Sequence, residues 1–225
     1  MVDVSADIVA SLPETLILWD VDHTLIENGG VSKETYALAF ELLVGHAPSV
    51  RPATDGRTDF QIMRELLVAN SIDNTKYVDI AQFEGVLVEA MKRRVPQLPQ
   101  RGHILPGVVE VLTALSEVPT VVQSVLTRFG SDDKVRSHLV DAARRKVMEK
   151  CGKMFDRSST ILVGDTPLDV KAAHDGGAKI IAVATGVHSA SELVDAGADV
   201  VLDSLTDLGH FMVALVDLRT AVTSV

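Results

Sequence analysis

Two pairs of carboxylates follow short apolar runs, and their spacing could support chemistry. Asp20 and Asp22 come at the end of one run, Asp165 ends another, and Asp169 follows four residues later. Carboxylates this close repel one another unless a cation or a shared proton intervenes. Carboxylates together with water are ligands that suit Mg²⁺. The pattern predicts a magnesium site in which one aspartate attacks a substrate and a second transfers a proton.

Both pairs also have a plain structural interpretation, which the spacing leaves open. Aspartate is a common turn former after a strand, which would account for Asp20 and Asp22. A negative charge in the first turn of a helix is favourable in itself, which would account for Asp169.

The elements that must position these residues alternate between strands and helices. Short runs of Leu, Ile and Val bounded by polar residues are typical of buried parallel strands. We expect strands that end at Asp20, Thr127, Asp165, Val183 and Leu202. We expect helices over 106–115, 132–150, 167–174, 189–196 and 207–219. This alternation predicts an α/β fold with a doubly wound, mostly parallel sheet, whose strand ends share one edge.

The segment between the first strand and residue 103 has a different pattern. Apolar residues recur at helical spacing after Ser32, over 58–69 and over 78–94. Gly29 and Gly30 precede this segment, and Pro96, Pro99 and Gly102 follow it. We therefore expect an all-helical insert over 29–102 and an α/β core formed by 1–28 and 103–225.

Composition limits the class of protein. The net charge is −10, which argues against a nucleic-acid or anionic membrane surface as the partner. Cys151 is the single cysteine, so a disulfide framework is not expected. The first fifteen residues lack a basic cluster, and no apolar run reaches the length of a membrane span. We expect a soluble cytoplasmic protein, either a monomer or a homodimer.

Two motifs of the sequence resemble those of the haloacid dehalogenase superfamily. Asp20-Val21-Asp22-His23-Thr24 is similar to its first motif, and Gly164-Asp165 through Asp169 is similar to its fourth. The likeness extends to 105–115 and 160–202, and the insert after the first strand resembles the helical cap of the phosphoglycolate-phosphatase-like branch. His23 stands where this motif commonly has glycine, and we interpret it as a tolerated side chain beside the loop.

The resemblance implies a role for each matching residue. Asp20 would be the nucleophile that forms an aspartyl-phosphate, and Asp22 would be the general acid and base. Asp20, the backbone carbonyl of Asp22, and Asp165 would hold Mg²⁺, and Asp169 would orient one of its water ligands. Thr127 would bind the transferring phosphoryl group. Dehalogenases lack the second aspartate, so Asp22 points to phosphate transfer, in which a departing alcohol needs a proton.

The third motif of the superfamily is a Lys or Arg, and here the sequence departs from the pattern. The stretch after Thr127 is too short for the strand and helix that relatives place there, so these are deleted or the stretch is incomplete. Arg136 is the best candidate for the basic residue, followed by Lys134 and Arg128. Each could equally be a solvated charge on a helix.

The helical insert would choose the substrate, as the caps of relatives do. Arg57 and Thr58 lie at a turn into a helix N-terminus, where anions bind well. We expect them to reach the substrate, although a helix cap with an exposed arginine fits equally.

The leading hypothesis is a Mg²⁺-dependent phosphatase acting on a small phosphorylated metabolite. The alternatives are a phosphomutase and a non-catalytic binding protein, which would have lost its phosphate-binding site because the stretch after Thr127 is short.

Overall fold

The computed structural model describes residues 12–220 except 74, 76, 78–79 and 127–136. These residues form two compact units. The core unit contains residues 12–26, 104–126 and 137–220, and the helical unit contains 27–103. Among the described residues, the helical unit is one continuous segment between two parts of the core unit.

The core unit contains a five-stranded sheet. Its strands are β1 (Thr15–Trp19), β4 (Val121–Val125), β5 (Thr160–Gly164), β6 (Lys179–Val183) and β7 (Val200–Leu202). They lie in the order β4-β1-β5-β6-β7, and every neighbouring pair is parallel. The predicted α/β fold with a parallel, doubly wound sheet is confirmed. The sheet order places β5 between β1 and β6, which decides the geometry of the site.

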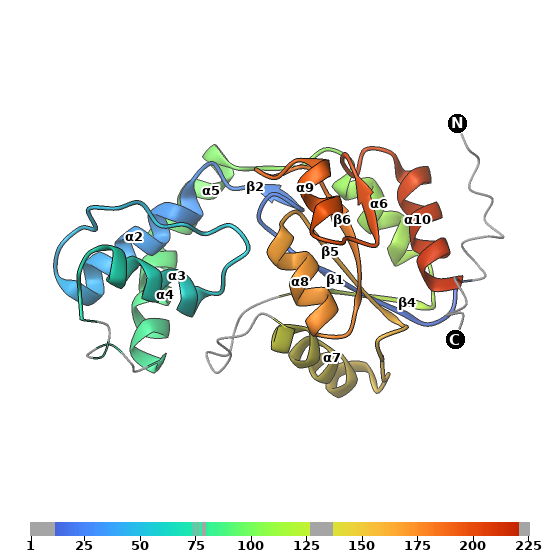
Figure 1. Cartoon of the computed structure of the whole chain (residues 1–225), viewed down its shortest axis with the longest axis horizontal. Helices are drawn as coiled ribbons and strands as arrows, with labels where there is room; N and C mark the ends of the chain where they lie inside the picture. The colour runs from blue at the N-terminus through green and yellow to red at the C-terminus, as the bar shows by residue number, and fades with distance from the viewer. Residues whose placement is uncertain (1–11, 74, 76, 78–79, 127–136, 221–225) are drawn as a thin grey trace. The chain divides into compact units, whose positions relative to one another are not determined.

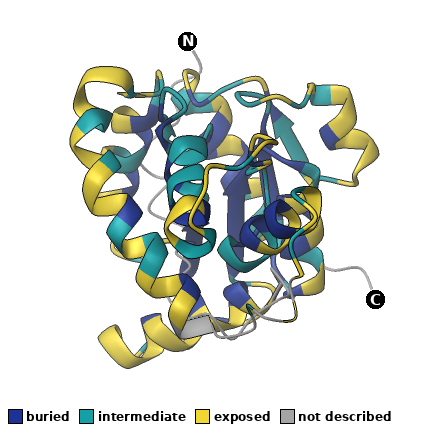
Figure 2. Ribbon diagram, turned by 90° about the vertical axis from the view of Figure 1, so that its left-hand side faces the viewer, coloured by how far each residue is buried: buried dark blue, intermediate teal, exposed yellow. Residues whose placement is uncertain are grey.

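The central strands β1, β5 and β6 are mainly apolar because both faces of the sheet are covered. Along β1, Leu16 and Leu18 pack in one hydrophobic cluster, whereas Ile17 and Trp19 pack in another. Alternation sends successive side chains to opposite faces, so a strand buried on both faces reads as a continuous apolar run. Figure 2 shows this directly: the strands are buried, and the helices around them are exposed on their outer sides.

Five helices cover the two faces of the sheet (Figure 1). One cluster joins the sheet to α6 (Val108–Ser116) and α10 (Leu208–Thr220). The other joins it to α7 (Ser137–Cys151), α8 (Pro167–Asp175) and α9 (Ala190–Asp195). In the part of the chain that the structure describes, no helix has the length and apolar character needed to cross a membrane.

The helical unit has its own core. It contains α2 (Val31–Val44), α3 (Asp59–Ala69) and α4 (Ile80–Arg94), followed by the short helices η2 (Val95–Gln97) and α5 (Leu98–Arg101). Phe40, Met63, Leu67 and Phe83 are buried between the three long helices. The two short helices were not predicted, because Pro96 and Pro99 suggest a break. Both prolines occupy first-turn positions of their helices, where the missing N–H costs nothing.

The two connections between the units pair with each other. β2 (Ile26–Glu27) and β3 (His103–Ile104) form a two-stranded sheet that was not predicted. Gly29 has a φ of +59°, and a Cβ atom built on it would lie 2.4 Å from the carbonyl oxygen of Arg101. Only glycine fits there, because any side chain would collide with that backbone.

Candidate metal centre and active site

The first two site residues follow neighbouring strands. Asp20 comes directly after β1, and its backbone N–H donates to the carbonyl of Val163 in β5 at 2.9 Å. Asp165 comes directly after β5. The register pairs Trp19 with Val163, so the two strands end at nearly the same level. The parallel pairing therefore brings together two carboxylates that are far apart in the sequence.

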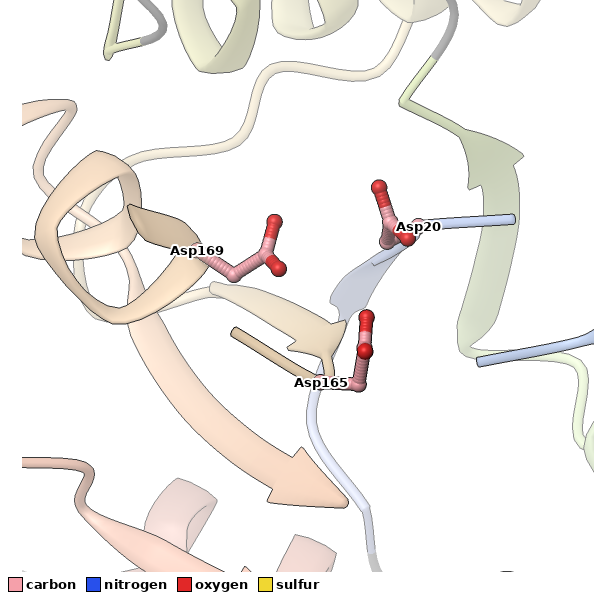
Figure 3. A group of neighbouring side chains, drawn as sticks. All are labelled: Asp20, Asp165 and Asp169. Carbon is pink, nitrogen blue, oxygen red and sulfur yellow. The ribbon is translucent and has the colours of Figure 1, made fainter. Parts of the chain in front are cut away.

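A third carboxylate joins them from the helix that follows β5. One carboxylate oxygen from each of Asp20, Asp165 and Asp169 lies within 4.8 Å of the others. Figure 3 shows the three side chains converging from the ends of β1 and β5 and the start of α8. Asp165 and Asp169 are buried, with exposed fractions of 2% and 0%, whereas Asp20 is half-buried. Buried carboxylates with a common focus are the donor set that hard divalent cations prefer, so these residues fit Mg²⁺.

Asp169 caps α8, and its carboxylate also belongs to the cluster of three. Its Oδ2 accepts from the backbone N–H of Thr166 at 3.1 Å and from the Thr166 hydroxyl at 2.6 Å. The Thr166 hydroxyl accepts from the Asp169 N–H in return, which completes a capping box at the start of α8. The cap fixes the direction of the Asp169 side chain, so helix capping and convergence with Asp20 and Asp165 belong together.

Thr24 also contributes to the site. This residue belongs to the first motif, but no role was predicted for it. It is fully buried, and its hydroxyl donates to Oδ1 of Asp165 at 3.4 Å. A hydroxyl four residues after a strand-end aspartate is a weak signal, because only the fold shows that it faces Asp165.

Asp22 and His23 lie in the turn between these residues. Asp22 is half-buried and forms an isolated bridge with Ile26, and its carboxylate is not one of the three that converge. Its role in acid–base chemistry and metal binding stays a prediction. His23 has a φ of +59°, in the left-handed region that favours glycine, which explains why a glycine would suit this position.

The other predicted site residues fall into two groups. Thr127, Arg128, Lys134 and Arg136 fall outside the described residues. Arg57 and Thr58 lie in the helical unit. The Arg57 Nε pairs with Glu65 at 2.8 Å, and its guanidinium also donates to the carbonyl of Asp55. Thr58 is buried and caps α3, where its hydroxyl accepts from the Gln61 N–H. Their role in substrate binding stays a prediction.

The chain was compared with family models, with curated proteins and with solved structures. A family model described as HAD-hydrolase-like matches residues 133–208. None of the curated proteins matches the chain. Over the residues that it matches, the family model agrees with the resemblance to the haloacid dehalogenase superfamily.

Several solved structures share the fold over nearly the whole chain. A candidate beta-phosphoglucomutase from Bacteroides vulgatus is 17% identical, with a TM-score of 0.63, covering 96% of this chain and 100% of its own. A hydrolase from Pseudomonas syringae is 20% identical, with a TM-score of 0.61, covering 88% and 96%. A predicted phosphoglycolate phosphatase from Haemophilus somnus is 14% identical, with a TM-score of 0.56, covering 88% and 97%.

Proposed function

We propose that the chain is a Mg²⁺-dependent hydrolase of phosphomonoesters that acts through an aspartyl-phosphate on Asp20. The convergence of Asp20, Asp165 and Asp169 within 4.8 Å carries this proposal. The names of the neighbours support it, since they include hydrolases and phosphatases. The net charge of −10 makes a local cation necessary for binding an anionic ester.

The proposed reaction has two steps. In the first, a carboxylate oxygen of Asp20 attacks the phosphorus, and the bond from phosphorus to the alcohol oxygen breaks. Asp22 gives its proton to the departing alkoxide. In the second, Asp22 takes a proton from water as that water attacks the phosphorus of the acyl phosphate. The bond from phosphorus to Asp20 breaks, inorganic phosphate leaves, and both aspartates regain their starting states.

The bound cation would be held by Asp20, Asp165 and Asp169, together with the backbone carbonyl of Asp22. When bound, Mg²⁺ neutralises the charge of the phosphoryl oxygens. The chain's own residues orient the site: the cap of α8 holds Asp169, and Thr24 contacts Asp165. Of the predicted phosphoryl ligands, Thr127 would bind an equatorial oxygen and Arg136 would pair with the phosphate.

The helical unit would act as the cap that selects the leaving group, with Arg57 and Thr58 as its contacts. The substrate class is a small phosphorylated metabolite. We also assign the protein to the cytoplasm, since a single cysteine suits a reducing compartment.

The test is phosphate release from a panel of phosphomonoesters with Mg²⁺ and with EDTA, using wild type and Asp20→Asn. We expect release that needs the metal and that disappears in Asp20→Asn. Thr113→Val, on the exposed surface of α6, is the control that keeps wild-type activity. Release that persists unchanged in Asp20→Asn would remove Asp20 as the nucleophile.

A phosphomutase is the second candidate, because one neighbour is described as a candidate beta-phosphoglucomutase. The two reactions differ in whether water or a sugar hydroxyl accepts the phosphoryl group. Incubation with phosphosugars, followed by ³¹P NMR, separates them: a mutase yields an isomeric ester, and a hydrolase yields inorganic phosphate. A folded protein that forms neither product across the panel would favour the binding protein.

A further inference from the structure

The turn after β6, residues 184–186, lies against Asp165 on the side away from β1. The sheet order puts β5 between β1 and β6, so Asp165 has a turn on each side. From the β1 side, Thr24 donates to Oδ1 of Asp165 at 3.4 Å. From the β6 side, a Cβ atom built on Gly186 would lie 1.8 Å from Oδ2 of the same carboxylate. Both oxygens of Asp165 are therefore confined by the two turns.

Gly186 has no conformational reason to be glycine. Its φ lies outside the left-handed region, so its backbone conformation is open to other residues. What a side chain would meet is the carboxylate of Asp165 and, at 3.2 Å, the Cβ of His23. The space that a methyl group would fill is the space that Oδ2 of Asp165 occupies.

Thr185 joins the two turns across the end of β5. Its hydroxyl donates to the backbone carbonyl of His23, which lies 162 positions earlier in the chain. The backbone N–H of Ala184 donates to Leu202 in β7 at 2.8 Å, which ties the β6 turn to the rest of the sheet. The first-motif turn, in which His23 has a left-handed conformation, is thus hydrogen-bonded to the β6 turn, which is itself hydrogen-bonded to β7.

We propose that Thr185 and Gly186 are positioning residues of the metal centre. Thr185 fixes the turn that carries Asp22 and Thr24, and Gly186 leaves the space that Oδ2 of Asp165 occupies. This inference rests on the proposed function, since it concerns how the same carboxylates are held. Residues that orient metal ligands affect metal affinity strongly. We therefore expect that loss of the Thr185 hydroxyl, or a methyl group added at Gly186, weakens metal binding by about 10-fold or more.

The experiment measures Mn²⁺ binding to the full chain by electron paramagnetic resonance, since Mn²⁺ accepts the same oxygen ligands. Thr185→Val removes the hydroxyl at nearly constant shape, and Thr185→Ser keeps it. Gly186→Ala adds one methyl group at the position of Oδ2 of Asp165, so we expect it to displace that carboxylate. Thr113→Val and Gly85→Ala are matched controls on exposed helix surfaces, and a Cβ at Gly85 meets nothing within 4 Å.

We expect Mn²⁺ affinity to fall about 10-fold or more in Thr185→Val and Gly186→Ala, to be restored in Thr185→Ser, and to stay unchanged in the controls. The metal-free melting temperatures give the structural effect separately. If wild type binds Mn²⁺ through Asp20 and both variants bind it equally well, the positioning role is wrong and the proposed function stands. If wild type binds no Mn²⁺, the metal centre fails and the positioning role fails with it.

Discussion

The carboxylate of Asp169 packs directly over the backbone of Gly164. A Cβ atom built on Gly164 would lie 2.6 Å from Cγ of Asp169 and 2.7 Å from its Cβ. Gly164 is the last residue of β5 and immediately precedes Asp165. The glycine thus lets the first turn of α8 approach the strand end closely enough for Asp169 to join the other two carboxylates.

Gly164→Ala is expected to displace Asp169 and weaken the site. Overpacking of a buried position costs about 1–3 kcal/mol, and here the strain falls on the side chain of Asp169, which belongs to the carboxylate cluster. Denaturant unfolding should show the loss of stability, and Mn²⁺ titration should show the loss of affinity. Gly85→Ala is the control, with neither loss. Wild-type Mn²⁺ affinity in Gly164→Ala would contradict the close packing.

Because His23 has a left-handed backbone conformation, we expect the stability of the protein to depend on the shape of the side chain at this position. A variant with a β-branched residue at φ +59° is expected to have a free energy of unfolding about 1 kcal/mol lower than the asparagine variant, since asparagine tolerates this region. Urea unfolding of His23→Val and His23→Asn measures the difference. Ser71, in the helical unit, has the same φ, so Ser71→Val against Ser71→Asn should repeat it. Equal stability of the two His23 variants would contradict the expectation.

Arg101, in α5, contacts residues at the start of the helical unit. Its guanidinium donates to both carboxylate oxygens of Glu34 and to the carbonyl of Gly29 at 2.7 Å. The hydrogen bond from Arg101 lowers the pKa of Glu34. We therefore expect Arg101→Met to raise the Glu34 pKa, which NMR titration of the side-chain carboxyl measures. Arg93→Met, which removes a surface pair with Glu89, should leave the Glu34 pKa as it is.

The lowered pKa of Asp156 leads us to expect that the stability of the protein depends on pH. Hydrogen bonds from Ser159 and Ser158 lower the pKa of its carboxyl to about 2 from 3.8. Because the folded-state pKa lies below the unfolded one, its contribution is present above pH 3.8 and is lost as the pH falls toward 2. Exposure limits this contribution to below about 1 kcal/mol.

Urea unfolding of wild type and Asp156→Asn at several pH values from 7 downward checks this expectation. The difference between them should be constant near neutral pH and should shrink in acid. Ser159→Ala should raise the Asp156 pKa. A difference that grows as the pH falls would contradict the assignment.

Arg57 offers a test of the proposed substrate contact. If its guanidinium binds the leaving group, Arg57→Ala should raise KM with a smaller effect on kcat. Glu65→Gln is the matched variant, since it removes the 2.8 Å ion pair and keeps the arginine. Equal effects of both variants on KM would assign Arg57 a structural role.

The sequence determined most of the fold through patterns that depend on near neighbours. Apolar runs predicted the buried strands, and helical spacing predicted α3 and α4 close to their observed bounds. A helix cap was one of the two interpretations of Thr58, and the structure shows that Thr58 caps α3 in a capping box with Gln61. Asp20 and Asp165 were found because each follows a recognisable strand.

The tertiary structure decided what depends on sheet order and close approach. Thr185 contacts His23 only because β6 and β1 lie on either side of β5, and no local pattern shows that neighbourhood. Gly164 and Gly186 are ordinary strand-end glycines in the sequence, and their importance depends on which carboxylate lies above each. The sequence alone thus identified the residues that could react, whereas the packing of distant segments decided how they are held.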